Sequence, residues 1–470
     1  MNNLLKNVYE NSPIFLQNIM TSIYGYVLSK RRFPKNQSEL LQQLKELEFI
    51  SKRELEKFKL KELQKIIIYS YNKVPYYKKL FKDINFNPNN IEDFNDIRRI
   101  PFLTKEKINL QPNQLISKEF DQDKLVIHKT SGSTGSPLAI YKDGECNNRS
   151  FAYWERLRRN HGVKIGDKKA TFFGRAIVSK KQSKPPFWRY NLTQNQLLFS
   201  IFHLTQDNLP AYINKLEEFA PLYIESYPSA LFVIAKYLEE NKININLNLK
   251  CIFTTAENLE ADKRELIEEQ FKTKIVDQYG SSEAVVFAGE CKYGNMHIFP
   301  GFGFVEVIDE EGNPTDGLGE IVVTGFLNKA MPFIRYKLGD MVELDKDFKC
   351  KCGRSSAVIV NLGGRKDDLI ITPDGNQVSR LGYVLKNNSE VKEAQIIQND
   401  IREIIIKVVP NKGVLEINKD KIITSIKKRL GEEINYSIVE AQEIPRQENG
   451  KFRYVVCNLS DKQKEEILRS

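Results

Sequence analysis

Apolar residues recur at helical spacing through the first 70 residues of the chain. The clearest stripe falls on one side of a helix and consists of Leu55, Phe58, Leu63, Ile66 and Ile67. Such spacing is typical of a helix that packs one face on a core. We therefore expect a largely helical lead-in over residues 1–120.

The segment 12–28 is the most apolar part of this lead-in, and Ser29-Lys30-Arg31-Arg32 follow it. A helix of this kind lies either on a membrane surface or against the protein's own core. Gln17, Asn18 and Gly25 interrupt the apolar run, and these interruptions favour packing on the core.

From about residue 125 onward, short apolar segments typical of strands alternate with helical segments. Three such segments are LVIH at 125–128, FVEVID at 304–309 and IVVT at 321–324. Strands that alternate with helices predict layered α/β architecture. The fold class we expect is therefore α/β, with a large N-terminal domain over residues 1–363.

The last hundred residues predict a separate, smaller α+β unit. Three segments there are typical of strands, namely 369–372, 391–398 and 403–409, and 418–430 predicts a helix that ends at Gly431. Two glycines and four charged residues at 363–368 suit a hinge, because glycine tolerates large changes of backbone dihedrals. We expect residues 364–470 to form a mobile lid.

Bulk composition excludes several classes of protein. The 470 residues include only six cysteines, which is not a disulfide framework and fits a reducing compartment. No run approaches the roughly 18–20 apolar residues that span a bilayer. The start, MNNLLKNVYE, lacks the pattern of a secretory signal, so we expect a cytoplasmic protein.

The net charge of +10 is concentrated locally. Residues 156–189 hold eleven Lys and Arg against a single acid, Asp167. A solvated lysine-rich surface is the interpretation we favour, and a surface for a phosphate-bearing partner is the alternative. Zinc-finger spacing, RNA-recognition signatures and basic zippers are missing from the sequence, so we expect no nucleic-acid partner.

A loop rich in glycine and hydroxyls follows the strand predicted at 125–128. It reads TSGSTGSP at 130–137 and includes Thr130, Ser131, Gly132, Ser133, Thr134 and Gly135. Glycines let amide N–H groups converge on phosphate oxygens, and the hydroxyls add donors. The loop is neither a Walker motif nor a nucleophile elbow, because the spacing that each requires is missing.

Three further motifs follow the loop in order: YGSSE at 279–283, RYKLGD at 335–340 and PRQENGK at 445–451. With them the chain resembles the adenylate-forming acyl/aryl-CoA ligase superfamily, and within it the phenylacetate–CoA ligases of the capsular-polysaccharide branch. SPIFLQN at 12–18, VPYYKKLF at 74–81 and IPFLTKEKI at 100–108 add branch-level likeness. Ser136 stands where many members have lysine.

The resemblance implies an ATP site built from these motifs. Thr255, Ala256 and Glu257 would line the adenine pocket. In the segment Tyr279, Gly280, Ser281, Ser282 and Glu283, the ring would stack on adenine, a hydroxyl would meet the α-phosphate, and Glu283 would hold Mg²⁺. A hard cation that bridges phosphates prefers carboxylate oxygen.

Four more residues take roles by the same resemblance. Asp340 would accept both ribose hydroxyls, and Arg365 would contact ribose or phosphate. Asp367 matches the hinge position. Lys451 matches the mobile catalytic lysine, whose cation would stabilise negative charge that develops on the α-phosphate.

Two short spans hold a candidate metal site, Cys291-x5-His297 and Cys350-x-Cys352. Three thiolates and one imidazole are a common ligand set for structural zinc. Four unrelated residues are the alternative. Because some phenylacetate–CoA ligase relatives carry cysteines in similar places, we favour zinc.

The resemblance implies that ATP and a small-molecule carboxylate give an acyl-adenylate and pyrophosphate. CoA thiol ranks slightly ahead as the acyl acceptor, and an amine on a sugar or amino acid is the alternative. Two interpretations of another class remain open: a non-catalytic scaffold, and a membrane-surface factor in contact with polysaccharide machinery.

Overall fold

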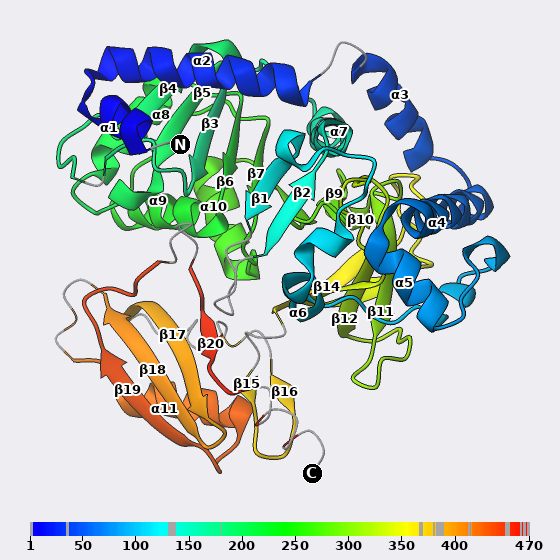
Figure 1. The fold of residues 1–470 in the computed structure, drawn as a ribbon. Helices are drawn as coiled ribbons and strands as arrows, with labels where there is room; N and C mark the ends of the chain where they lie inside the picture. Colours follow the sequence, from blue (N-terminus) through cyan, green and yellow to red (C-terminus); the bar gives the residue numbers. More distant parts are fainter. Residues whose placement is uncertain are drawn as a thin grey trace.

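The computed structural model shows a large N-terminal domain with a smaller domain beneath it (Figure 1). It describes residues 3–33, 37–129, 138–179, 181–365, 370–378, 381, 390–411, 414, 416–446, 452–460, 463 and 467. The predicted phosphate loop at 130–135, the predicted hinge residue Asp367 and the predicted catalytic Lys451 lie outside the described residues.

Six α-helices lie in the described part of residues 3–110. The helices are α1 (Asn3–Asn11), α2 (Ile14–Arg32), α3 (Gln37–Glu48), α4 (Lys52–Lys73), α5 (Pro75–Asp83) and α6 (Lys105–Leu110). Helix α4 begins with a capping box between Ser51 and Glu54, which satisfies N–H groups at its first turn. Within the described part of the chain, none of the helices is long and apolar enough to cross a bilayer.

One twelve-stranded sheet forms the frame of the large domain, in the order β11-β12-β13-β14-β10-β9-β8-β7-β6-β3-β5-β4. Its first six strands in the chain are β3 (Lys169–Phe173), β4 (Trp188–Asn191), β5 (Gln196–Ser200), β6 (Tyr223–Ser226), β7 (Cys251–Thr255) and β8 (Ile275–Gly280). The other six are β9 (Phe287–Glu290), β10 (Met296–Ile298), β11 (Gly303–Ile308), β12 (Gly319–Gly325), β13 (Tyr336–Asp345) and β14 (Val358–Arg365). A separate hairpin, β1 (Val126–Lys129) with β2 (Ala139–Lys142), flanks the predicted phosphate loop.

The sheet is parallel where helices connect its strands. Strands β5, β3, β6, β7 and β8 pair in parallel, and α8 (Leu209–Phe219), α9 (Pro228–Glu240) and α10 (Ala261–Phe271) pack their apolar sides on one face. Helix α7 (Gly144–Asn160) covers the other face. Neighbouring residues of β6 show this layering, because Tyr223 packs beneath α7 and Ile224 beneath α9.

The small domain is a four-stranded sheet in the order β19-β18-β17-β20, with one helix packed on it. Its elements are β15 (Ile370–Ile371), β16 (Gln377–Val378), β17 (Val391–Asp400), β18 (Glu403–Pro410), α11 (Lys419–Leu430), β19 (Asn435–Glu440) and β20 (Val455–Cys457). Helix α11 ends at Gly431, whose φ of 92° favours glycine. The α+β unit predicted for the last hundred residues is confirmed.

Strand β14 continues two residues past the boundary expected at 363/364. Arg365 pairs with Asp340 of β13, and Gly364 pairs with Met341. Gly364 and Arg365 therefore belong to the large sheet, and the connection between the domains begins after them.

Candidate active site and thiol–imidazole cluster

One cavity of about 1970 Å³ lies where the parallel strands end and the small domain approaches. It exceeds the several hundred Å³ of an ordinary small-molecule site. The predicted site residues that line it are Ala256, Glu257, Tyr279, Gly280, Ser281, Ser282, Glu283, Asp340 and Arg365. Segments far apart in the sequence thus converge on one space.

Three strands bring these residues together. Strand β8 ends at Gly280, so Tyr279 is its last residue but one, before the loop that carries Ser281 and Glu283. Strands β13 and β14 place Asp340 directly opposite Arg365. Ligands of α/β sheets bind outside the carboxyl ends of the strands, and the cavity lies at such an edge.

Asp340 is the centre of a buried polar group. The Tyr279 hydroxyl donates to its Oδ2 at 2.7 Å, and Arg365 Nε lies 2.9 Å from its Oδ1. The pKa of Tyr279 is raised well above its usual value, first by burial and then by the Asp340 carboxylate. The pKa of Arg365 is raised chiefly by Asp340. Each carboxylate oxygen keeps a lone pair free for a further donor.

Glu283 is a buried carboxylate in the wall of the cavity. Its Oε1 accepts a 3.4 Å hydrogen bond from the Tyr336 hydroxyl. Ser281 Oγ, in the same loop, is buried and has no hydrogen-bond partner among the described residues. The Glu283 carboxylate and the unsatisfied Ser281 hydroxyl on one cavity wall fit a magnesium-bound phosphate.

Glu257 does more than line the cavity. Its Oε2 accepts from the Ser229 backbone N–H and its Oε1 from the Ser229 hydroxyl, both at 3.0 Å, at the first turn of α9. Its Oε1 also accepts from the Phe452 backbone N–H at 3.2 Å. The carboxylate therefore links the large domain to the residue that follows the predicted catalytic Lys451.

Two further contacts hold the small domain against the cavity. Lys263 of α10 lies over the Tyr454 ring at 3.7 Å from its centroid, and Lys236 of α9 donates to Asn411 at 3.4 Å. Phe452 and Tyr454 line the cavity. The backbone on the C-terminal side of Lys451 is thus fixed at the site.

One end of the cavity is basic, and the sequence marks it only in part, because Arg158 and Arg175 fall in the basic window 156–189 and the other residues do not. Arg32, His128, Lys142, Arg158 and Arg175 line it. Arg158 and Lys169 lower the pKa of Glu225 to about 2, against the effect of burial. Burial, then the charges of Lys142 and Arg32, lowers the pKa of His128 to about 4. Arg32, His128 and Lys142 come from separate elements, so no local motif marks them.

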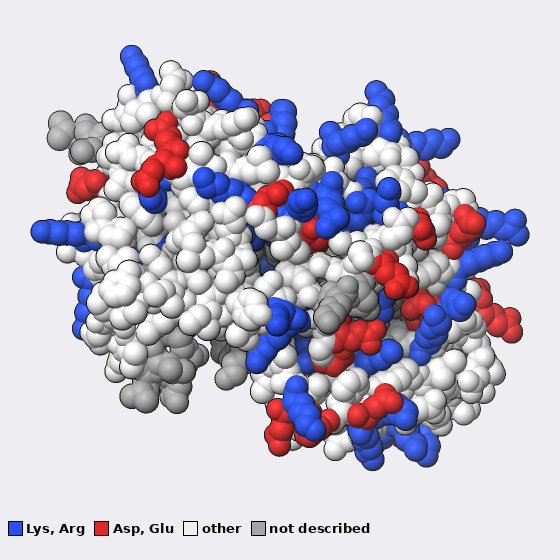
Figure 2. Space-filling model, turned by 90° about the horizontal axis from the view of Figure 1, so that it is seen from above, with Lys and Arg blue, Asp and Glu red and all other residues white. Residues whose placement is uncertain are grey.

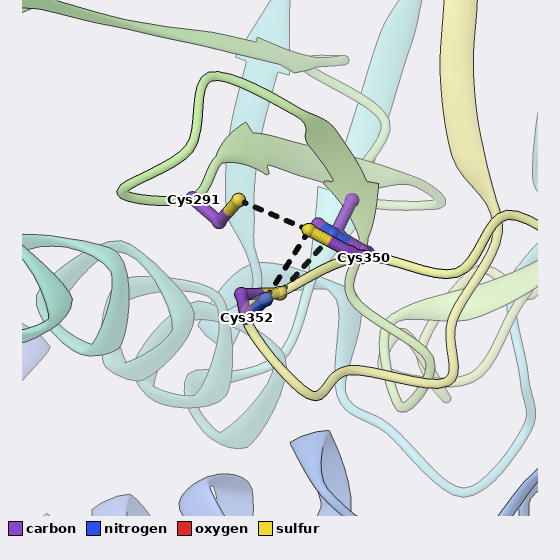
Figure 3. Close-up of side chains that lie close together, drawn as sticks. Cys291, Cys350 and Cys352 are labelled. Atoms are coloured by element: carbon purple, nitrogen blue, oxygen red, sulfur yellow. Dashed lines mark hydrogen bonds between the residues drawn. The ribbon is translucent and has the colours of Figure 1, made fainter.

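The candidate metal residues form a compact cluster. The ligand atoms of Cys291, His297, Cys350 and Cys352 all lie within 4.8 Å of one another. Cys291 Sγ lies 3.7 Å from Cys350 Sγ, and Cys352 Sγ lies 3.4 Å from His297 Nε2 (Figure 3). A tetrahedron with zinc–sulfur bonds of 2.3 Å has edges of about 3.8 Å, so the spacing fits four-coordinate zinc.

The surroundings of the cluster also suit a metal. His297 Nδ1 lies 3.2 Å from the Ser356 carbonyl, and donation there leaves Nε2 free as a ligand. All six cysteines lie in the described part of the chain, and they form no disulfide. Strand β14 starts six residues after Cys352 and ends at Arg365, so one strand connects the cluster to the cavity.

Comparisons with known proteins show which family the chain resembles. The model of the CapK C-terminal domain matches residues 370–458. Protein CapK of Staphylococcus aureus is 31% identical over 466 residues, which are 97% of this chain and 100% of that protein. The phenylacetate-coenzyme A ligase of Thermus thermophilus is 23% identical and covers 87% of this chain and 98% of its own length.

Solved structures share the fold at low identity. A 2-hydroxyisobutyryl-CoA ligase in the postadenylation state, in complex with R3-HIB-AMP, gives a TM-score of 0.68 at 18% identity over 90% of this chain and 94% of its own. The same ligase in the thioesterification state, with 2-HIB-AMP and CoA, gives 0.55 over 88% and 91% at 20% identity. Because the chain is 31% identical to the Staphylococcus aureus protein over nearly the full length of both, it belongs to the CapK family of the adenylate-forming ligase superfamily.

Proposed function

We propose that this AMP-forming ligase activates a small carboxylic acid with ATP, forms an acyl-adenylate, and passes the acyl group to the thiol of CoA. The observation that carries the proposal is the convergence of Tyr279, Glu283, Asp340 and Arg365 on one cavity. Curated relatives named phenylacetate-coenzyme A ligases support the same reaction class.

In the first half-reaction, a carboxylate oxygen of the acid attacks the α-phosphorus of ATP, and pyrophosphate leaves. Asp340 receives the ribose hydroxyls, and Arg365 fixes that carboxylate from the other side. The ammonium group of Lys451 stabilises the negative charge that develops on the phosphoryl oxygens. Glu283 would hold Mg²⁺, which would neutralise phosphate charge.

In the second half-reaction, the CoA thiol attacks the acyl carbon and AMP leaves. The small domain turns about Asp367 between the two steps. The contacts of Glu257 with Phe452 and of Lys263 with Tyr454 belong to the adenylating arrangement. The higher TM-score to the postadenylation state than to the thioesterification state supports this assignment.

Cys291, His297, Cys350 and Cys352 hold one structural zinc ion. The set supplies four ligands and leaves no position open, so zinc stabilises the fold and takes no part in the reaction. Its effect is to fix the chain that enters β14, the strand that presents Arg365 to Asp340.

The reaction serves capsular-polysaccharide synthesis in the cytoplasm. Kinship with Protein CapK supports this setting, and the absence of a disulfide among the six cysteines fits a reducing compartment. Contact with membrane-bound polysaccharide machinery is part of the same proposal.

Carboxylate-dependent exchange of labelled pyrophosphate into ATP tests the first step without knowledge of the acceptor. Aryl acids, amino acids and uronic acids form the panel, and the expected result is exchange with one class. With that acid, ATP and CoA, mass spectrometry should find acyl-CoA. Acyl-AMP that accumulates with CoA and clears only when an amine is added would assign the acceptor to amines instead.

A further inference from the structure

Helix α2 is inverted relative to an ordinary surface helix. Its buried residues are Gln17, Ser22 and Gly25, the polar and small positions that interrupt its apolar sequence. Its exposed residues include Phe15, which is 62% exposed, and Ile23, which is 60% exposed. A surface helix normally turns its apolar stripe to the core. Helix α2 packs on the protein, as expected, but through its polar and small residues.

The polar face of α2 is held by the edge of the large sheet. Arg189 Nε donates to Gln17 Oε1 at 2.5 Å, and the Tyr190 backbone N–H donates to Asn18 Oδ1 at 2.9 Å. These donors belong to β4, the last strand of the sheet, whose edge would otherwise remain unpaired. The side chains of α2 thus satisfy backbone and side-chain groups of the edge strand.

The next turn of α2 fixes the orientation further. The Leu192 backbone N–H donates to Ser22 Oγ at 3.0 Å, and Gln194 Nε2 donates to the Gly25 carbonyl at 3.1 Å. A Cβ at Gly25 would lie 2.4 Å from the Asn191 side chain. Since close approach and hydrogen bonds hold this side, the helix cannot rotate to bury its apolar residues.

The exposed face of α2 combines an apolar stripe with a basic end. The stripe consists of Phe15, Ile19, Ile23, Tyr26 and Val27, all exposed. Lys30 and Arg31, also exposed, follow it on the last turn, and α2 contains no acidic residue. Figure 2 views the molecule from above in the orientation of Figure 1, where α2 lies at the top, and shows a broad area without charged side chains, with Lys, Arg, Asp and Glu around its edge.

We propose that α2 docks the protein on the surface of an anionic lipid bilayer. Phe15, Ile19 and Ile23 enter the boundary between headgroups and acyl chains, and Lys30 and Arg31 meet anionic headgroups. The charge pattern favours a bilayer over a second copy of the chain. A two-fold contact through α2 would offer the basic residues no acidic partner, because α2 has none.

Docking through α2 has a consequence for the active site. Ile23, Tyr24, Val27 and Arg32 of this helix also line the cavity that holds Tyr279 and Asp340. The bilayer therefore lies against one rim of that cavity. If the proposed function holds, acyl transfer takes place at the membrane surface, next to acceptors whose apolar part lies in the bilayer.

Flotation of the full-length protein with vesicles tests the docking without any substrate. With phosphatidylcholine vesicles that contain about 30% phosphatidylglycerol, the protein should float, and with pure phosphatidylcholine it should bind more weakly. The triple variant Phe15→Ser, Ile19→Ser, Ile23→Ser should bind at least about tenfold more weakly. Lys30→Gln and Arg31→Gln should each lower binding about fivefold, and added salt should remove that difference.

Leu110→Ser is the matched control. Leu110 is 79% exposed on α6, so its loss should leave both fold and vesicle binding unchanged. All variants change exposed side chains, and thermal unfolding should confirm that they fold. Failure of the parent protein to float, or equal flotation of the triple variant, would overturn the proposal. The proposal would also be overturned if light scattering found a dimer of the parent protein and a monomer of the triple variant. A second copy of the chain, and not a bilayer, would then cover the exposed face of α2. None of these results depends on carboxylate activation.

Discussion

Strand β14 has a cluster of reactive side chains at each end, and the two clusters differ in the size of the space that they surround. Beyond its C-terminal end, Arg365, Asp340, Tyr279 and Glu283 face a cavity large enough for a nucleotide and an acid. Before its N-terminal end, Cys350 and Cys352 meet Cys291 and His297 around a space of atomic size. Both clusters combine groups that lie far apart in the sequence.

The difference is in what remains unsatisfied. At the cavity, Ser281 Oγ lacks a partner among the described residues and Glu283 has only a weak one, so this cluster needs a ligand from solution. At the other end, the four ligand atoms lie within 4.8 Å of one another, and the Asn295 amide and the Cys352 backbone N–H donate to Cys350 Sγ. A single ion can take all four atoms as ligands. An open cluster suits turnover, whereas a closed one suits stability. Substitutions at the two ends should therefore separate activity from folding.

Loss of the closed cluster should have the largest effect. Cys352→Ser, or removal of metal by a chelator, should lower the free energy of unfolding by roughly 4–5 kcal/mol, because loss of a structural metal is among the most destabilising changes. Thermal unfolding and metal analysis measure this. Cys457→Ser, at a partly buried cysteine outside the cluster, is the control. An unchanged melting temperature after complete metal removal would contradict the structural role.

Removal of the predicted catalytic cation should affect activity alone. Lys451→Ala should lower the adenylation rate by roughly 10²–10³, about 3–4 kcal/mol, because charge on the α-phosphate loses its stabilising cation. ATP binding and melting temperature should stay as in the parent. Pyrophosphate exchange at the parent rate in this variant would show that another group supplies the charge.

Asp340→Asn tests the open cluster itself. An amide keeps the shape but cannot accept from Tyr279, Arg365 and two ribose hydroxyls as a carboxylate does. Exchange measured against ATP concentration should show a loss of about 10² in kcat/KM. If Asp340→Asn lowers the melting temperature as much as Cys352→Ser, the two ends of β14 do not differ as argued.

Much of this arrangement can be predicted from the sequence because its parts are local. The residues YGSSE follow one strand, and RYKLGD lies in another, so motif order locates the cavity wall. Cys350 and Cys352 are neighbours, and their partners Cys291 and His297 lie within seven residues. The likeness of these motifs to a known family then assigns roles that spacing alone does not.

The rest depends on contacts that sequence patterns do not encode. Gln17 and Gly25 look like interruptions of an apolar helix, yet they are the face that binds β4. The link from Glu257 to Phe452 joins residues 195 positions apart. Arg32, His128 and Lys142 meet only because α2 and the β1–β2 hairpin line the same cavity.

Glu257→Gln tests the link between the two domains. The amide retains the volume but accepts more weakly from Ser229 and from the Phe452 N–H. Because Phe452 follows Lys451, looser placement should lower adenylation about tenfold and leave ATP affinity nearly unchanged. Glu265→Gln, at an exposed carboxylate of α10, is the control. Equal loss in both variants would exclude a specific link.

The smallest expected effect concerns His128, at the basic end of the cavity. Burial, then Lys142 and Arg32, lowers its pKa to about 4 from the usual 6.5. Between these values, the unfolded chain takes up a proton at His128 and the folded chain does not, so stability falls as pH falls from about 6.5 to 4. His128→Gln should therefore show a smaller drop in melting temperature between pH 7.5 and pH 5, by about a few degrees. In Arg32→Gln the pKa of His128 should rise toward 6.5, and the drop in melting temperature between pH 7.5 and pH 5 should be somewhat smaller than in the parent protein. An identical drop in the parent and in both variants would show that His128 does not contribute to the loss of stability at low pH. Other titratable groups would then cause that loss.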